Sequence, residues 1–165
     1  MKNLYKVLVS TLLIATFGFG QVSFIEHTVS SNASDNDVWG IYAVDLDQDG
    51  DKDILSVSRD INPTSAKVAW HKNDGNESFT EITISTSYSG IFAVFPIDLD
   101  SDGDIDVLTD DVWFKNDGSE NFSATTVHAD YTPYNRAYAA DLDGDSDIDV
   151  LSASSSYDRI AWYEN

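Results

Sequence analysis

The chain has 165 residues, 42% hydrophobic and 12% aromatic, so it is long enough for a domain with a core and too apolar for a disordered acidic tail. Its formal net charge of −20 at pH 7 argues against nucleic acid or an anionic lipid surface as a partner, because phosphate groups would be repelled. The absence of cysteine excludes disulfide bonds and thiolate metal sites.

Residues 1–20 have the layout of a secretory signal peptide. Lys2 and Lys6 precede a short apolar run over residues 7–17, and small residues follow at Gly18 and Gly20. The run is shorter than the roughly 20 residues that a membrane-spanning helix needs. We therefore expect cleavage after Gly20 and a secreted or cell-surface protein with no membrane span after cleavage.

Residues 22–30 are expected to form a leading β-strand. The segment Phe24–Val29 matches two later β-prone segments, Phe79–Ile84 and Phe122–Val127. The leading strand therefore looks like the last strand of a repeated unit that stands ahead of the first complete copy.

Three acidic ladders follow along the chain, each with five aspartates at alternate positions. The aspartates are Asp45, Asp47, Asp49, Asp51 and Asp53; Asp98, Asp100, Asp102, Asp104 and Asp106; Asp141, Asp143, Asp145, Asp147 and Asp149. Such charges repel one another unless a cation neutralises them, and Ca²⁺ takes about six to eight oxygen ligands from flexible loops. The three ladders repeat in register, and each has one leucine, at its second residue. This repetition disfavours a merely solvated charge run. The pattern predicts up to three Ca²⁺ sites.

An EF-hand is the main rival interpretation of these ladders, and it fails at loop position twelve. That loop requires a bidentate glutamate there, whereas this chain has Ser56, Thr109 and Ser152.

The sequence around the ladders repeats as well. An aromatic residue precedes each ladder by three positions, a short β-prone run follows it, and a third strand carries a tryptophan in register: Tyr42, Phe95 and Tyr138; Trp70, Trp113 and Trp162. Asp-Gly then predicts a hairpin turn into a fourth strand. The tryptophans are expected in the core. The repeats span residues 39–85 and 88–128, with an incomplete repeat over 134–165.

Four antiparallel strands at this period predict an all-β fold, a β-propeller with three blades' worth of strands. Closed propellers typically have about 4–8 blades. Either the chain is part of a longer propeller, which we favour, or copies associate through open blade edges so that the leading strand of one pairs with the incomplete repeat of another.

The Asp loops, the Ile/Val-Leu-Ser/Thr strings that follow them and the Ala-Trp-His-Lys-Asn-Asp-Gly type of string resemble FG-GAP/VCBS repeats, which are similar to the blades of the integrin α-subunit propeller. The resemblance covers nearly all of residues 22–165. It implies side-chain ligands at loop positions one, three, five and nine and a carbonyl ligand at seven, namely Asp45, Asp47, Asp49 and Asp53 with the Asp51 carbonyl; Asp98, Asp100, Asp102 and Asp106 with the Asp104 carbonyl; Asp141, Asp143, Asp145 and Asp149 with the Asp147 carbonyl.

The third loop departs from the family pattern because Ser146 replaces the glycine at position six. Backbone strain at a residue with a Cβ costs on the order of 1 kcal/mol. We therefore expect the third Ca²⁺ site to be the weakest.

The sequence favours a non-enzymatic function. The aspartates would be occupied by metal and recur with the repeat, and the three histidines, His27, His71 and His128, are scattered without a nucleophile motif. We expect a Ca²⁺-stabilised binding or adhesion scaffold for a protein or glycan partner, with Trp39 as a weaker candidate for a binding surface than for blade packing. The alternatives are an accessory propeller of a larger extracellular polysaccharide-acting enzyme and a purely structural spacer.

Overall fold

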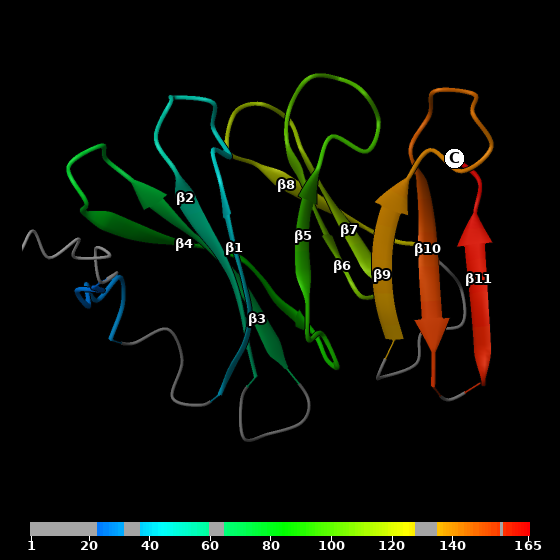
Figure 1. Ribbon diagram of the computed structural model, residues 1–165, viewed down its shortest axis with the longest axis horizontal. Helices are drawn as coiled ribbons and strands as arrows, with labels where there is room; N and C mark the ends of the chain where they lie inside the picture. Colours follow the sequence, from blue (N-terminus) through cyan, green and yellow to red (C-terminus); the bar gives the residue numbers. More distant parts are fainter. Residues whose placement is uncertain (1–22, 32–36, 60–64, 128–134, 156) are drawn as a thin grey trace, which may run out of the picture.

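The computed structural model describes residues 23–31, 37–59, 65–127, 135–155 and 157–165 (Figure 1). Within those ranges the chain forms β-strands and no helix, and so nothing there is a helix that could cross a membrane. The expected signal peptide, His128 and residue 22 of the expected leading strand lie outside the described residues.

The described strands form three antiparallel sheets. The first has the order β1 (Val38–Val44), β2 (Asp53–Arg59), β3 (Ala66–Asn73), β4 (Phe79–Tyr88). The second has the order β5 (Val94–Ile97), β6 (Asp106–Thr109), β7 (Val112–Asn116), β8 (Phe122–Thr126). The third has three strands, in the order β11 (Arg159–Tyr163), β10 (Asp149–Ser154), β9 (Asn135–Ala140).

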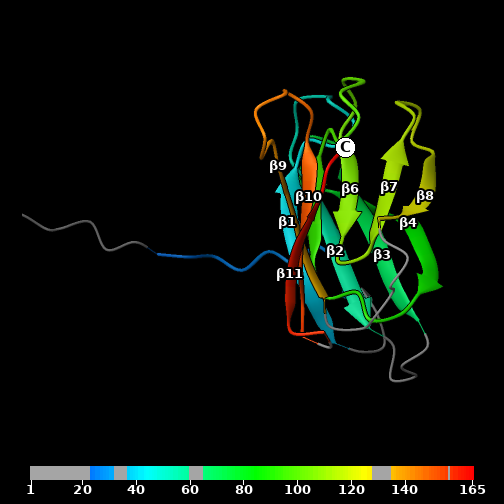
Figure 2. The same cartoon turned by 90° about the vertical axis from the view of Figure 1, so that its right-hand side faces the viewer.

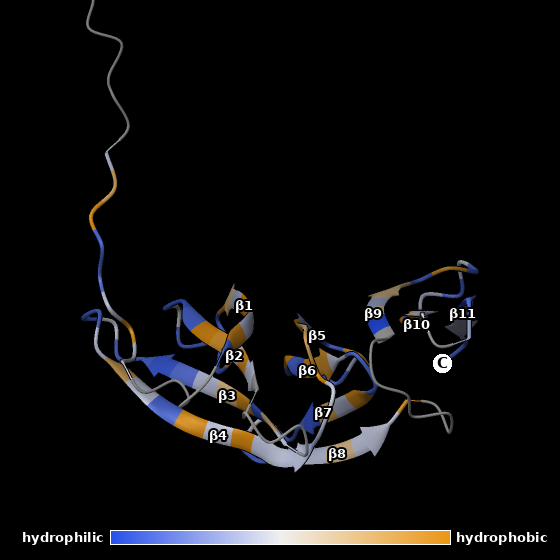
Figure 3. Cartoon of the chain, turned by 90° about the horizontal axis from the view of Figure 1, so that it is seen from below, coloured by the Kyte–Doolittle hydropathy of each residue, from blue (hydrophilic) through white to orange (hydrophobic). Residues whose placement is uncertain are grey.

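The three sheets follow one another as blades along an open arc (Figure 3), and Figure 2 views the molecule from the side of the third sheet. The second sheet lies between the first and the third, and the strands of each sheet follow the chain from β1, β5 or β9 outward. The predicted all-β class and the partial propeller are confirmed, and the described strands do not close a ring.

The period-two pattern of the sequence places one side-chain row of each sheet against the next sheet. Leu55 on β2 lies opposite Tyr42 on β1 and Trp70 on β3, so the three share a face. Leu55 and Trp70 are buried, and Tyr42 packs edge-to-face on Phe95 of the second sheet at a centroid distance of 5.8 Å. Alternation of apolar residues thus builds the contact between neighbouring blades.

Two hydrophobic clusters form the core, one at each junction between blades. The larger cluster lies between the first two sheets and contains Leu46, Leu55, Val57, Ala66, Val68, Trp70, Ile91, Val94, Val107, Val112 and Phe114. The smaller cluster lies between the second and third sheets and contains Leu99, Leu108, Ala139 and Val150.

A buried carboxylate organises the tight turn between β6 and β7. Asp110 is 1% exposed, and its side chain accepts hydrogen bonds from the backbone N–H groups of Phe92 and Ala93 in the segment before β5. Arg136 at the start of β9 approaches it at 3.5 Å. Burial raises the pKa of Asp110 to about 6 despite these contacts.

Two sequence expectations fail at the ends of the arc. Residues 23–31 form no strand in this structure, and Phe24 and Ile25 are 91% and 80% exposed. The expected leading strand is therefore not formed over these residues in this structure. Trp162 is 45% exposed rather than part of the core, whereas Trp70 at the equivalent position is 1% exposed. The difference arises because none of the three described sheets covers the outer face of the third blade.

Candidate metal centres

The three acidic loops join the first two strands of each sheet and lie along one edge of the arc (Figure 1). Each loop leaves the first strand of its sheet, the edge strand β1, β5 or β9, and returns into the strand beside it, β2, β6 or β10. The repeat therefore sets three equivalent acidic sites side by side.

Each loop gathers three carboxylates into a cluster that could hold a cation. In each cluster one oxygen from every member lies within 4.8 Å of the others, and the members are Asp45, Asp47 and Asp49; Asp98, Asp100 and Asp106; Asp141, Asp143 and Asp149. The structure thus brings together nine of the fifteen predicted aspartates in groups of three.

The first aspartate of each loop also closes the loop by accepting a backbone N–H from position six. The bonds run from Gly50 to Asp45 (3.1 Å), from Gly103 to Asp98 (3.0 Å) and from Ser146 to Asp141 (3.2 Å). Position six has φ values of +102°, +97° and +83° in the three loops. Ser146 therefore adopts a left-handed conformation that L side chains disfavour, as the sequence implied. The lower affinity expected of the third site stays a prediction.

The ninth aspartate has a structural role that the sequence alone did not reveal. Asp53 is fully buried and accepts the backbone N–H of Leu46 in its own loop (3.0 Å) and of Asn73 at the end of β3 (2.8 Å). The same bonds recur in the other blades: Leu99 and Asn116 to Asp106, and Leu142 and Asn165 to Asp149. This carboxylate ties the acidic loop to the third strand of its blade, and ligation by Asp53 stays a prediction.

The seventh aspartate lies against the Asp-Gly turn of its blade. Gly75 has φ +76°, and a Cβ built there would lie 2.5 Å from Oδ2 of Asp51. Gly118 and Asp104 repeat the arrangement in the second blade. The carboxylates of Asp51 and Asp104 therefore occupy the space that a side chain at the glycine would need, and the predicted metal ligand at this position is the carbonyl.

Two lysines reach into the first two loops, which sequence reasoning missed. Lys72 Nζ lies 2.6 Å from Oδ2 of Asp47 and 2.5 Å from Oε1 of Glu120, and these hydrogen bonds raise the pKa of Lys72. Lys115 pairs in the same way with Asp100, and its ammonium lies 3.1 Å from Asp102. The signal was present in the repeat, because both lysines stand two residues after the in-register tryptophan.

The second blade also shows how these contacts shift carboxylate pKa values. The backbone N–H of Asp104, followed by the Lys115 ammonium, lowers the pKa of Asp102. In the third blade Glu164 stands at the position equivalent to Lys115. The pKa of Asp143 in that blade is raised, first by desolvation and then by neighbouring carboxylates. The third loop thus lacks the local positive charge of the other two.

Two carboxylate oxygens in the clusters carry the strongest indication of a cation. Oδ1 of Asp45 and Oδ1 of Asp100 are buried and have no hydrogen-bond partner among the described residues. An unpaired buried carboxylate oxygen is costly, and a hard divalent cation would satisfy it. The all-oxygen donor set fits Ca²⁺, which prefers carboxylate and carbonyl ligands.

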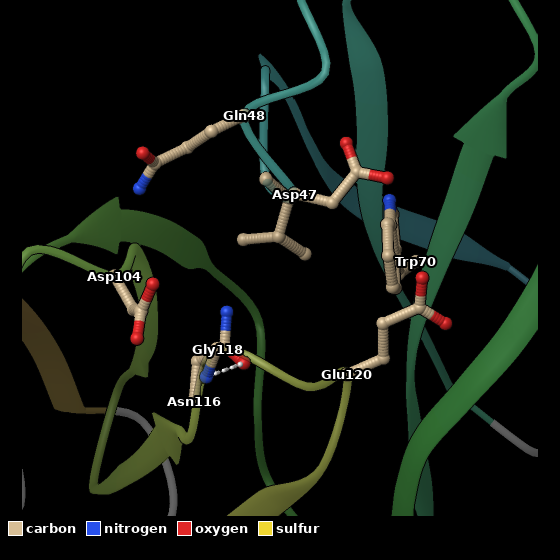
Figure 4. A pocket seen from close by; sticks show the side chains of 8 residues that line it. Asp47, Gln48, Trp70, Asp104, Asn116, Gly118 and Glu120 are labelled. Atoms are coloured by element: carbon tan, nitrogen blue, oxygen red, sulfur yellow. Dashed lines mark hydrogen bonds between the residues drawn. The ribbon is translucent and has the colours of Figure 1, made fainter.

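The space between the first acidic loop and the second blade is a small pocket (Figure 4). Its volume is about 30 Å³, and Asp47, Trp70, Gly118 and Glu120 are among its lining residues. Across it, the Gln48 side chain donates a hydrogen bond to the carbonyl of Gly103 (2.6 Å), which links the first loop to the second. A space of this size holds about one water molecule and no organic substrate.

Comparison with known families supports the sequence reading for part of the chain. The model of the FG-GAP-like repeat matches residues 45–109, which include the first two acidic loops. No curated protein and no solved structure gave a significant match. The resemblance is confirmed over residues 45–109, where the chain matches the FG-GAP-like repeat.

Proposed function

We propose that this protein is a secreted, non-enzymatic β-propeller scaffold that binds Ca²⁺ at its acidic loops and presents its blades to a protein or glycan partner. The observation that carries the metal assignment is the pair of buried, unpartnered oxygens on Asp45 and Asp100, each within a triple carboxylate cluster. The FG-GAP-like repeat and the blade architecture support a scaffold function.

The Ca²⁺ ions would be structural. Each cluster sits on a loop whose ninth aspartate is tied to the third strand of the blade, as Asp53 is to Asn73. An ion bound there would hold the connection between the first two strands, and its binding free energy would add to the free energy of unfolding. It would also lower the repulsion among the 29 acidic residues of the chain.

The surroundings of His71 favour a non-enzymatic scaffold. His71 Nε2 lies 2.9 Å from Oγ of Ser56, the geometry of a nucleophile and a base, but the two side chains are 3% and 4% exposed. Burial lowers the pKa of His71, and Glu81, which could orient it, pairs with Lys67. A substrate could not reach this pair, so it serves to satisfy polar groups within the first sheet.

Calorimetric titration with CaCl₂ tests the metal assignment. We expect saturable binding at up to three sites, a higher melting temperature with Ca²⁺ and loss of one site in Asp45→Asn. Asp37→Asn is the matched control, because Asp37 is exposed and outside the clusters. Absence of binding heat, together with a melting temperature indifferent to EDTA, would refute the assignment. Export is tested separately, since the N-terminal sequence of exported protein should begin at Gln21.

A glycan array and pull-down from the surrounding medium test the binding role with the Ca²⁺-loaded protein. Specific retention of one glycan class or one protein supports the scaffold. A lack of retention in the presence of saturating Ca²⁺ would leave the chain with a structural function only, contrary to the proposal.

A further inference from the structure

We propose that the first two acidic loops bind Ca²⁺ cooperatively and that the Gln48 side chain couples them, an inference that rests on the Ca²⁺-binding function proposed above. Gln48 belongs to the first loop, and its Nε2 donates a hydrogen bond to the carbonyl of Gly103 in the second loop (2.6 Å). Figure 4 shows the Gln48 side chain extending toward the side of the pocket where Asp104 lies. This bond joins two candidate metal centres directly, across the junction of the first two blades.

On the second loop, the bond ends at a residue that holds two of the loop's aspartates. The N–H of Gly103 donates to Oδ2 of Asp98 (3.0 Å). The carbonyl that Gln48 binds belongs to the peptide group between Gly103 and Asp104, and the N–H of that same group donates to Oδ1 of Asp102 (3.0 Å). Because a peptide group is planar, fixing its carbonyl also fixes the N–H that Asp102 accepts.

On the first loop, Gln48 stands between two members of the carboxylate cluster. Asp47 precedes it and Asp49 follows it, and the N–H of Asp49 donates to Oδ1 of Asp47 (3.4 Å). An ion that draws Asp47 and Asp49 together would fix the backbone from which the Gln48 side chain extends. Occupancy of the first loop would thus be felt at the peptide group of the second loop.

The kind of residue at loop position four supports a role for the longer side chain. This position has a left-handed backbone in all three loops, with φ of +59° at Gln48, +58° at Ser101 and +84° at Gly144. Glycine and asparagine adopt that conformation more readily than glutamine does. Gly144 has no side chain, and within the described residues no hydrogen bond runs from Ser101 to the third loop. The direct link between neighbouring loops is therefore particular to Gln48.

Two further contacts hold the first loop against the second blade. Leu46 is 1% exposed and belongs to the core cluster between the first two sheets. The ammonium of Lys72 lies 2.6 Å from Asp47 and 2.5 Å from Glu120, which belongs to the second blade. The position of the loop therefore does not depend on Gln48 alone, and a substitution there should remove the coupling without separating the blades.

The coupling should be positive. In an empty loop the carboxylates repel one another, so the first ion must order the loop that it enters. Through Gln48 this order extends to the second loop, and the ordering cost is smaller for the second ion. One hydrogen bond changes an equilibrium constant roughly three- to tenfold. Repulsion between the two bound ions opposes the effect, and salt at about 0.15 M screens it beyond about 8 Å.

Ca²⁺ titration followed by NMR tests the coupling in each loop separately. The amide signals of Gly50 and Gly103 report on the first and second loops, because each N–H donates to the first aspartate of its own loop. The third loop is disabled throughout by Asp141→Asn, at an ionic strength of about 0.15 M. Adding Asp45→Asn should lower the affinity of the second loop roughly three- to tenfold, and adding Asp98→Asn should lower that of the first loop by the same factor.

Gln48→Asn separates the coupling from the loss of charge that Asp45→Asn also causes. Asparagine tolerates the left-handed backbone, but it is one methylene shorter and its amide should no longer reach Gly103. In the Gln48→Asn protein, disabling the first loop should change the affinity of the second loop by less than about twofold. Ser101→Asn makes the matched change at position four of the second loop and should leave the coupling factor at its wild-type value.

The possible failures can be told apart. If both loops bind Ca²⁺ and neither affinity depends on the other loop, the coupling is refuted and the Ca²⁺-binding function stands. A coupling factor that stays at its wild-type value in Gln48→Asn would overturn the role of Gln48. If neither Gly50 nor Gly103 responds to Ca²⁺, the coupling and the proposed function fail together.

Discussion

Removing the in-register tryptophan should cost far more stability in the first blade than in the third. Trp70 is 1% exposed between two sheets, whereas Trp162 is 45% exposed on the outer face of the arc. A tryptophan side chain buries about 150–250 Å², and replacing a buried one with alanine costs about 3–5 kcal/mol. Trp162 retains about half of that burial in a single chain, so Trp162→Ala should cost about 2 kcal/mol.

Urea unfolding followed by far-ultraviolet circular dichroism measures both losses without relying on tryptophan fluorescence. The protein must be dilute enough to be monomeric by light scattering, and Ca²⁺ must be held constant. Trp39→Ala is a useful control, because Trp39 is 49% exposed and packs on Phe92 at the same junction of blades. Equal losses for Trp70→Ala and Trp162→Ala in the monomer would refute the view that a neighbouring blade is the source of the stabilisation.

Three further substitutions test single contacts. Gly118→Ala should cost about 1–2 kcal/mol in urea unfolding, because φ is +70° and the new Cβ meets the Asp104 carboxylate; a neutral effect would contradict this. Lys72→Met should raise the Ca²⁺ affinity of the first loop roughly two- to fivefold by removing a cation from Asp47, and unchanged calorimetric affinity would show that the ammonium does not compete. The pKa of Asp110 is raised from 3.8 to about 6 in the folded chain, so its contribution to stability is complete below about pH 4 and is lost as pH rises through 6. The stability of wild type relative to Asp110→Asn should therefore fall by up to about 3 kcal/mol between pH 4 and pH 7.5, and a pH-independent difference would refute that assignment.

The blades were predictable because their determinants are local and repeated. Alternation around Leu55 and Leu108, the Asp-Gly turns and the aromatic positions recur with the same spacing, and so each copy supports the interpretation of the others. The position of the acidic loops followed directly, since each lies between two β-prone runs.

The different roles of aspartates within one loop could not be predicted. All five look alike in the sequence, but Asp53 enters the central strand and becomes buried, whereas Asp51 lies against Gly75 of a turn distant in the chain. These roles depend on contacts between the loop and the third strand, which the sequence separates by about 20 residues. The exposure of Trp162 was equally unpredictable, because it depends on whether another blade adjoins the third.

The third candidate metal centre differs from the other two in two ways that should act on affinity in opposite directions. We expect the φ of +83° at Ser146 to weaken Ca²⁺ binding there, by roughly 1 kcal/mol of backbone strain. Glu164, which stands where the first two blades have lysine, removes a competing ammonium and adds negative charge nearby. With the first two loops disabled by Asp45→Asn and Asp98→Asn, Ser146→Gly should therefore raise the Ca²⁺ affinity of the third loop several-fold, and Glu164→Lys should lower it. If Ser146→Gly leaves that affinity unchanged, the strain at position six is not what limits binding.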